Sequence, residues 1–330
     1  MSARISTLWD SVGNTPLLRI GTLSRGTGNE VLGKAEFMNP GGSIKDRAAK
    51  GMIRAAEASG QLKPGGTIVE GTAGNTGIGL TLLGRERGYR VVVTMPDNQA
   101  REKYEFLEAM GADVRKVPVV PFANENHFFH QARRLAEANP GWFWANQFEN
   151  PANADIHAET TAEEIWEQCE GKVDVLVASC GTGGTLGGVS SALKKKNPKL
   201  EVVLADPSGS GLYSYVREGK LEATGGSITE GIGIMRLTEN FKRARIDQAV
   251  RVTDQEMIEM LYHLAREDAL VVGTSAALNV RAAWELSRQR PNQGLRIVTF
   301  LCDHGSRYAS KVFNPAFLES KALSVRALQA

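Results

Sequence analysis

Three short segments of the sequence contain residue types that bind anions or act as nucleophiles. The first reads CGTGGTLGG at 180–188 and lies between the apolar run VDVLVAS and a predicted helix. A loop of this kind presents backbone N–H groups and the positive end of a helix dipole to a phosphate, and its glycines permit close approach. The segment predicts an anion site, with a simple strand-to-helix turn as the alternative.

The second segment, PGGSIKDR at 40–47, places Lys45 in the first turn of a predicted helix, beside its apolar side. The positive end of a helix disfavours a charged amine, and burial disfavours it further. Both effects favour the neutral amine, which is the nucleophilic form. A surface lysine paired with Asp46 or Glu57 is the alternative.

The third segment, EGTAGNTG at 70–77, ends a predicted strand in a turn rich in hydroxyl, amide and N–H groups. Such groups at the start of a helix can hold a carboxylate. Asn75 can instead occupy a left-handed turn position without any role in binding.

A dinucleotide site is another interpretation of the first segment. Gly181 and Gly183 follow a predicted strand, and Asp206 ends the next strand at the distance expected for a ribose-binding acid. Leu186, however, occupies the third glycine position. This interpretation also leaves the segments around Lys45 and Asn75 without a function.

The elements that position these segments alternate between strand and helix. The expected strands are 67–70, 90–95, 112–117, 143–145, 173–179 and 202–205. The expected helices are 43–60 (with Ser43 as its cap), 77–88, 99–110, 127–139, 160–170 and 186–196. This order predicts parallel sheets in two α/β lobes, with ligands at the carboxyl ends of the strands. The loops 71–77 and 181–185 are therefore expected to face a cleft between the lobes.

The three segments occur together with GNTPLLRI, NQFENPANADIHAETTAEEIW, EGIG, VVGTSAA and CDHGSRY, which begin at 13, 146, 230, 271 and 302. This combination resembles the fold-type II pyridoxal-phosphate enzymes, specifically the cysteine synthase and cystathionine β-synthase group. The resemblance implies a two-lobed α/β fold in which each lobe is a mostly parallel twisted sheet flanked by helices. It implies a smaller mobile lobe at 38–147 and a larger lobe of 1–37 plus 148–330 that carries the phosphate loop.

The resemblance also implies pyridoxal 5'-phosphate as cofactor and assigns residues to it. Lys45 matches the family's Schiff-base lysine, Asn75 the residue that bonds the ring hydroxyl, and Ser275 the serine that faces the pyridine nitrogen. The phosphate cup matches Gly181, Thr182, Gly183, Gly184 and Thr185. The positions implied for the substrate are Thr72, Ala73, Gly74, Asn75, Thr76, Gln147 and Gly231. No metal site is expected.

The reaction implied by the resemblance is β-replacement on an O-activated serine through an aminoacrylate. O-acetyl-L-serine and sulfide would give L-cysteine, with the Lys45 amine removing the Cα proton. The Ser275 hydroxyl is a poor proton source, which favours elimination at Cβ over transamination. The alternatives are L-cysteine desulfhydrase activity, which gives pyruvate, ammonia and sulfide, and then cystathionine formation from serine and homocysteine. A non-catalytic protein that only retains the cofactor is the alternative from another class.

The sequence departs from the family pattern at three places. Ala73 replaces the serine of T-S-G-N-T-G, Ala277 replaces the glycine of the usual S-x-G after the pyridine serine, and Ile234-Met235-Arg236 follows EGIG. These changes surround the substrate and spare the cofactor. Because the loss of one buried donor can redirect specificity, the residues predict the cofactor more directly than the substrate.

Composition excludes several other classes of protein. Among 330 residues, 39 Lys and Arg against 37 Asp and Glu give a formal charge of +2, which does not indicate a nucleic-acid or membrane partner. The expected partners are an amino-acid substrate and sulfide or a thiol, and the resemblance implies a homodimer. Three cysteines without a C-x-x-C pair, no signal-peptide core and no membrane-length apolar run predict a cytoplasmic protein.

Other reactive side chains receive structural interpretations. The five histidines are scattered, and His127 and His130 are expected on one face of an amphipathic helix. No G-x-S-x-G segment suggests a serine hydrolase. Cys180 and Cys302 are expected to be small core residues. Lys103 is expected on a solvated helix face.

Overall fold

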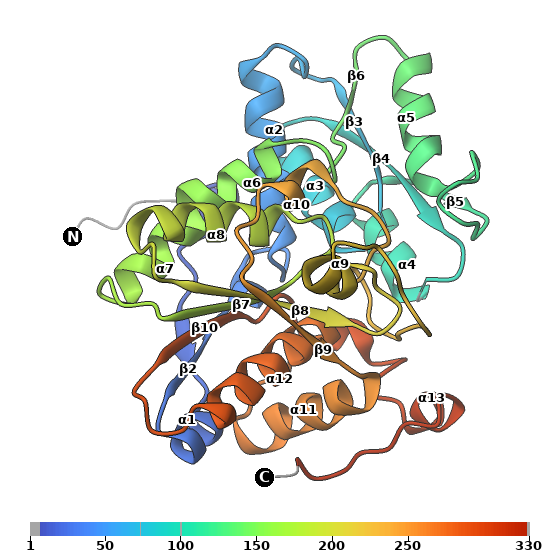
Figure 1. Ribbon diagram of the computed structural model, residues 1–330. Coiled ribbons are helices and arrows are strands. Elements are labelled where there is room, and N and C mark those ends of the chain that lie inside the picture. Colours follow the sequence, from blue (N-terminus) through green and yellow to red (C-terminus); the bar gives the residue numbers. More distant parts are fainter. Residues whose placement is uncertain (1–6, 73, 100, 329–330) are drawn as a thin grey trace.

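Two separate, mostly parallel sheets form the framework of the molecule (Figure 1). The computed structural model describes residues 7–72, 74–99 and 101–328. Helices cover both faces of each sheet. This arrangement confirms the predicted α/β class, in which strands buried on both faces are nearly continuous runs of apolar residues.

The smaller sheet has four parallel strands in the order β5-β4-β3-β6. They are β3 (Thr67–Gly71), β4 (Arg90–Pro96), β5 (Asp113–Val117) and β6 (Trp142–Trp144). Alternate residues serve opposite faces because successive side chains of a strand point in opposite directions. Ile68 and Val91 pack on α2 (Lys45–Ala58), α3 (Asn75–Glu86) and α4 (Arg101–Ala109), whereas Val69 and Val92 pack on α5 (Phe128–Ala138).

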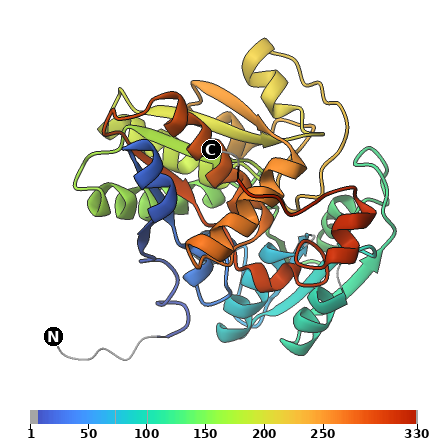
Figure 2. The ribbon, with the colours of Figure 1, turned by 90° about the horizontal axis from the view of Figure 1, so that it is seen from below.

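The larger sheet has six strands in the order β1-β2-β10-β7-β8-β9, of which only β1 is antiparallel to its neighbour. They are β1 (Leu17–Arg19), β2 (Glu30–Lys34), β7 (Val175–Ser179), β8 (Glu201–Pro207), β9 (Gln248–Val252) and β10 (Arg296–Phe300). One face packs on α11 (Asp254–Glu267) and α12 (Thr274–Gln289), which lie side by side in the view from below (Figure 2). The other face packs on α7 (Ala162–Gln168) and α8 (Gly184–Lys196).

Short elements complete the chain. They are α1 (Gly21–Thr27), α6 (Ala152–Ile156), α9 (Leu212–Glu218), α10 (Glu239–Lys242), α13 (Pro315–Ser320), two 3₁₀ turns (Glu36–Met38 and Gly305–Tyr308) and a π-helical turn (His157–Thr161). The helix expected at 160–170 therefore begins earlier, at Ala152, and continues through the π turn. The assigned helix begins at Lys45, after Ile44, which has helical dihedrals and makes no capping bond. The Ser43 hydroxyl accepts the N–H of Lys45 at 3.2 Å, which is the capping contact expected from the sequence.

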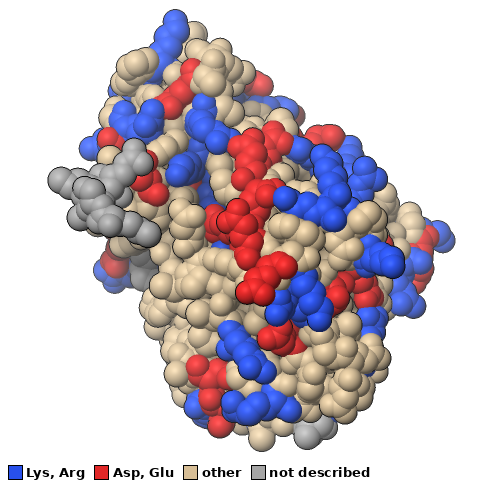
Figure 3. Space-filling model, turned by 90° about the vertical axis from the view of Figure 1, so that its left-hand side faces the viewer, with Lys and Arg blue, Asp and Glu red and all other residues tan. Residues whose placement is uncertain are grey.

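The surface carries both signs of charge. On the face shown in Figure 3, acidic side chains form a band with Lys and Arg on both sides. None of the helices in the described part of the chain is long and apolar enough to cross a membrane. The absence of a nucleic-acid partner stays a prediction, as does the division into lobes at 38–147.

A buried ion-pair network joins α2, which packs on the smaller sheet, to elements of the larger one. The guanidinium of Arg47 on α2 pairs with Glu36 at 2.8 Å and with Glu164 at 2.6 Å. Lys34 at the end of β2 pairs with the same Glu164 at 2.7 Å. Burial raises the pKa of Glu164, but the hydrogen bonds and charges of Arg47 and Lys34 outweigh it and hold that pKa at about 2.

We expect Glu164→Gln to destabilise the fold by about 3–5 kcal/mol at pH 7, because it removes the carboxylate that pairs with buried Lys34 and one of the two that pair with Arg47. The folded pKa lies below the ordinary 4.5, so the carboxylate stabilises the fold above about pH 4.5 and loses this effect as the pH falls towards 2. In urea unfolding, the difference in the free energy of unfolding between the parent and Glu164→Gln should therefore become smaller from pH 5 to pH 3. Glu167→Gln, at an exposed position of the same helix, is the control and should stay within about 0.5 kcal/mol of the parent. A Glu164→Gln protein as stable as this control would contradict the role of the network.

Candidate active site

A cavity of about 270 Å³ lies where the carboxyl ends of β3, β7 and β10 meet. Gly71, Ser179 and Phe300, which end these strands, line it. The cavity therefore lies at the strand edges where ligands bind in parallel α/β sheets.

Most residues that the sequence assigns to cofactor or substrate line this one cavity. They are Lys45, Thr72, Gly74, Asn75, Thr76, Gln147, Gly181, Thr182, Gly183, Thr185, Gly231 and Ser275. Gly184 is not part of the lining, and Ala73 lies outside the described residues. Residues separated by more than 200 positions in the chain thus share one site.

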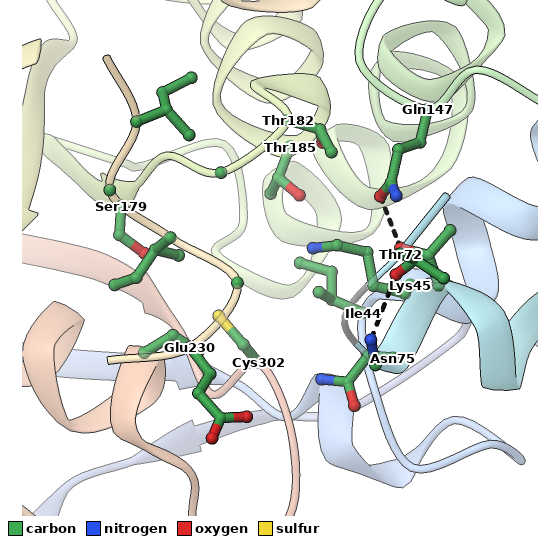
Figure 4. Close-up of a pocket in the computed structure, with 18 of the residues that line it drawn as sticks. Ile44, Lys45, Thr72, Asn75, Gln147, Ser179, Thr182, Thr185, Glu230 and Cys302 are labelled. Atoms are coloured by element: carbon green, nitrogen blue, oxygen red, sulfur yellow. Dashed lines mark hydrogen bonds between the residues drawn. The ribbon is translucent and has the colours of Figure 1, made fainter. Parts of the chain in front are cut away.

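Lys45 is the first residue of α2 and extends into the cavity. Figure 4 shows its side chain reaching across the cavity toward Thr182 and Thr185. The amine thus lies between the glycine loop, on the larger sheet, and the turn of Thr72 and Asn75, on the smaller sheet.

The glycine loop is a tight cup at the start of α8. A Cβ on Gly181 would collide with the carbonyl oxygen of Gly231, and one on Gly184 would collide with the Asn153 side chain. Gly183 has φ +88°, a conformation that favours glycine. The first N–H groups of a helix have no carbonyl partner within it, so this cup suits an anion such as a phosphate ester.

A neutral histidine, His157, contacts the cup through the Thr185 hydroxyl. The Nε2 of His157 lies 3.2 Å from the Thr185 hydroxyl, and its Nδ1 lies 2.9 Å from the Thr161 hydroxyl. Burial, together with the charges of Arg47 and Lys45, lowers the pKa of His157 well below its ordinary value. The sequence pattern does not single out this residue, because its role depends on the π-helical turn that carries it.

The side-chain amide of Asn75 is oriented by two charged groups. Its Nδ2 donates to Asp303 at 2.6 Å, and its Oδ1 accepts a hydrogen bond from Arg307. Only one orientation of the amide satisfies both partners. The second hydrogen on Nδ2 can then be donated to a ligand hydroxyl. Arg307 also donates to the Gly41 carbonyl, which links the CDHGSRY segment to the loop before Lys45.

A buried hydrogen-bond relay supports the turn at the start of α3. The Thr76 hydroxyl donates to Gln147 Oε1 at 2.6 Å, and Gln147 Nε2 donates to Glu70 at 3.1 Å. Glu70 also accepts the backbone N–H of Gln147 at 3.3 Å. Burial raises the pKa of Glu70 to about 8. The sequence pattern contains Glu70 only as the end of a strand and does not reveal this contact with Gln147.

The expectation that Lys103 lies on a solvated helix face is wrong. Its side chain is 8% exposed, lines the cavity and pairs with Glu230. Lys311 pairs with the other oxygen of Glu230 at 2.5 Å. Lys103 on α4 therefore connects the smaller sheet to the connection between α9 and α10.

Two thiols lie near the site, of which Cys180 is buried and Cys302 is partly exposed. Cys180 belongs to the core of the larger sheet, as expected, and Cys302 lines the cavity. Burial raises the pKa of both thiols, that of Cys302 to about 12. Both are therefore protonated near neutral pH and are weak nucleophiles.

These groups fit pyridoxal phosphate: an amine, a glycine cup for the phosphate, a fixed amide for the ring hydroxyl and the Ser275 hydroxyl on the cavity wall. No group of three or more potential metal ligands occurs among residues 7–72, 74–99 and 101–328. Fold and site together define an enzyme of the α/β class that binds a phosphorylated cofactor between two sheets.

The chain belongs to the family of pyridoxal-phosphate dependent enzymes, whose family model matches residues 8–303. It is 47% identical to "Cysteine synthase 1" of Emericella nidulans over 97% of this chain and 87% of that protein. It is 47% identical to "Cysteine synthase" of Dictyostelium discoideum, with coverage of 96% and 86%. A hydrogen sulfide-producing enzyme (Fn1220) from Fusobacterium nucleatum has a similar crystal structure, with a TM-score of 0.85, 31% identity and coverage of 92% of this chain and 100% of that chain. The predicted family and cofactor are confirmed.

We expect Glu70→Gln to change how stability depends on pH. The folded pKa of about 8 lies above the ordinary 4.5, so the unfolded chain releases this proton first and the fold loses stability as the pH rises from about 4.5 to 8. The amide cannot ionise. In urea unfolding between pH 5 and 8, the free energy of unfolding of the variant should therefore rise relative to that of the parent by up to about 1.4 kcal/mol per pH unit. The control Glu86→Gln, at an exposed position, should show the same pH dependence of the free energy of unfolding as the parent. A constant difference between Glu70→Gln and the parent would show that Glu70 ionises normally.

Proposed function

We propose that the enzyme converts O-acetyl-L-serine and sulfide into L-cysteine and acetate by β-replacement. The observation that carries this proposal is the position of Lys45 between an anion cup and a turn of neutral donors in one cavity. The cysteine synthases that match nearly the whole chain support the same reaction. In the overall reaction a C–O bond at Cβ breaks, acetate leaves, and a C–S bond forms at the same carbon.

The proposed roles of the residues come from the family motifs, and the shared cavity supports them. Bound pyridoxal phosphate supplies the electron sink that makes the substrate's Cα proton acidic. Lys45 holds the cofactor, and its amine takes that proton and returns it. Ser275, on the cavity wall, would hold the ring nitrogen, and because a hydroxyl is a poor proton donor it would favour loss of a group from Cβ over transamination.

The carboxylate of the amino acid is held by the turn 72–76 and Gln147. Hydroxyl, amide and backbone N–H groups at the start of α3 suit an anion there, and no arginine lines the cavity among the described residues. The relay from Glu70 through Gln147 to Thr76 fixes the positions of the Gln147 and Thr76 side chains beside this turn. Ala73 lacks the hydroxyl found in the family pattern, so the remaining donors carry more of the binding.

L-Cysteine desulfhydrase activity is the second candidate, because the Fusobacterium nucleatum protein of similar structure is a hydrogen sulfide-producing enzyme. The same groups acting on cysteine would release sulfide from Cβ, and reaction of the remainder with water would give pyruvate and ammonia. The proposal also includes a homodimer in the cytoplasm, with 38–147 as a mobile lobe. The three described cysteines are free, which supports a reducing compartment.

The Lys45 assignment is tested by Lys45→Ala. Because the amine both holds the cofactor and moves the proton, the variant should lose the visible absorbance of the bound cofactor and at least about a hundredfold in activity. Lys63→Ala, at an exposed loop position, is the control and should behave as the parent. A Lys45→Ala protein with normal absorbance and turnover would exclude this lysine.

Product analysis decides between the two candidate reactions. With O-acetylserine and sulfide, we expect cysteine and acetate in equal amounts and little pyruvate. With cysteine alone, we expect pyruvate at a rate well below that of synthesis. Faster release of pyruvate and sulfide from cysteine would replace the proposed function with the desulfhydrase.

A further inference from the structure

Arg236 lies among three aromatic rings. Its guanidinium carbon is 4.4 Å from the ring centre of Phe122, 4.8 Å from that of Phe129 and 4.4 Å from that of Phe148. The residue belongs to the Ile234-Met235-Arg236 segment, which departs from the family pattern. We call these four side chains the arginine cage.

The cage connects two parts of the molecule that are distant in the sequence. Arg236 lies in the connection between α9 and α10, which packs on the larger sheet (Figure 1). Phe122 precedes α5, Phe129 lies on α5, and α5 packs on the smaller sheet. Arg236 also donates to Glu149 Oε1 at 3.1 Å, and Glu149 Oε2 accepts the Glu239 N–H at the start of α10 at 2.9 Å.

Both sides of the cage adjoin the cavity. The residues just before Arg236, from Gly231 to Ile234, line the cavity, as do Gln147 and Phe148. The other end of the same connection is fastened to α4 by the pair between Glu230 and Lys103. The segment 230–236 is therefore tied at both ends to elements of the smaller sheet.

The cage requires the shape of arginine as well as its charge. A planar guanidinium can stack on several rings and still donate to a carboxylate, whereas a lysine ammonium is a compact and strongly hydrated charge. Arg236 is 25% exposed at its side chain, so water screens the contacts only in part. Loss of cation–π contacts of this kind changes an equilibrium constant by about tenfold.

We propose that Arg236 is a positioning residue, which holds the segment 230–236 at a fixed distance from Gln147 and Phe148 and so sets the width of the amino-acid subsite. Gly231 and Gln147 would contact the substrate from opposite sides. If the segment 230–236 is held less firmly, binding of the substrate and binding of the transition state are therefore weakened by the same factor. The kinetic part of this inference rests on the proposed function, whereas the contact between the two segments does not.

The kinetic experiment compares Arg236→Gln, Arg236→Lys and a control, Arg266→Gln. Arg266 lies over the Tyr262 ring at 5.1 Å on α11, away from the cavity. Arg236→Gln should raise KM for O-acetylserine about tenfold and leave kcat within about twofold, the pattern of lost uniform binding. The KM of Arg236→Lys should lie between those of Arg236→Gln and the parent. Arg266→Gln should have the KM and kcat of the parent. An unchanged KM in Arg236→Gln, or a fall in kcat without a change in KM, would overturn the proposal.

Hydrogen exchange of the pyridoxal-phosphate-loaded protein tests the contact without using activity. Arg236→Gln and Phe122→Leu should each speed exchange in both 230–236 and 121–130, and the control should do so in neither. Exchange that stays at the parent level would overturn the proposal, and so would faster exchange without a change in KM. If the parent does not convert O-acetylserine, the Kd of L-serine, measured by the cofactor's absorbance, takes the place of KM and should rise by the same factor.

Discussion

The buried ion pairs of Arg47 determine where the Lys45 amine lies. Lys45 stands two residues before Arg47 at the start of α2, a helix that packs on the smaller sheet. The glycine cup, on the other side of the cavity, begins α8 on the larger sheet. Because Glu36 and Glu164 hold Arg47 from the larger sheet's side, the first turn of α2 is fixed to both halves of the site. The geometry of the cavity follows from this attachment.

The expected strands correspond to six of the ten strands in the described part of the chain, and of these β3, β4, β7 and β8 are almost completely buried. β3 and β4 lie within one residue of the expected bounds, because every residue of Thr67–Gly71 and nearly every one of Arg90–Pro96 is buried. The strands β1, β2, β9 and β10 are not among the expected strands. β1 has only three residues, β2 is interrupted by Gly33, and β9 alternates buried with partly exposed positions at a sheet edge. β10 is missed although four of its five residues are buried. Strands such as β1 and β9 have little local signal, so their pairing depends on the rest of the sheet.

The family motifs indicate residues that meet in the cavity, but they do not reveal what supports them. Glu70, His157 and Asp303 act through contacts with residues that lie 28 to 228 positions away in the chain. No local pattern contains such a contact. Lys103 shows that a local pattern can also give a wrong prediction. A charged residue on an amphipathic helix is expected to be exposed, but Lys103 pairs with Glu230, which lies in the connection between α9 and α10. Roles toward the cofactor and substrate remain predictions from the motifs.

The protonated state of Cys302 has a consequence for the proposed reaction. β-Replacement makes the substrate's Cβ open to attack by any thiol within reach, and Cys302 lies on the cavity wall. Burial raises the pKa of Cys302 to about 12, so the thiol is protonated near neutral pH and is a weak nucleophile. In the proposed reaction this thiol would therefore be a poor competitor of external sulfide for Cβ.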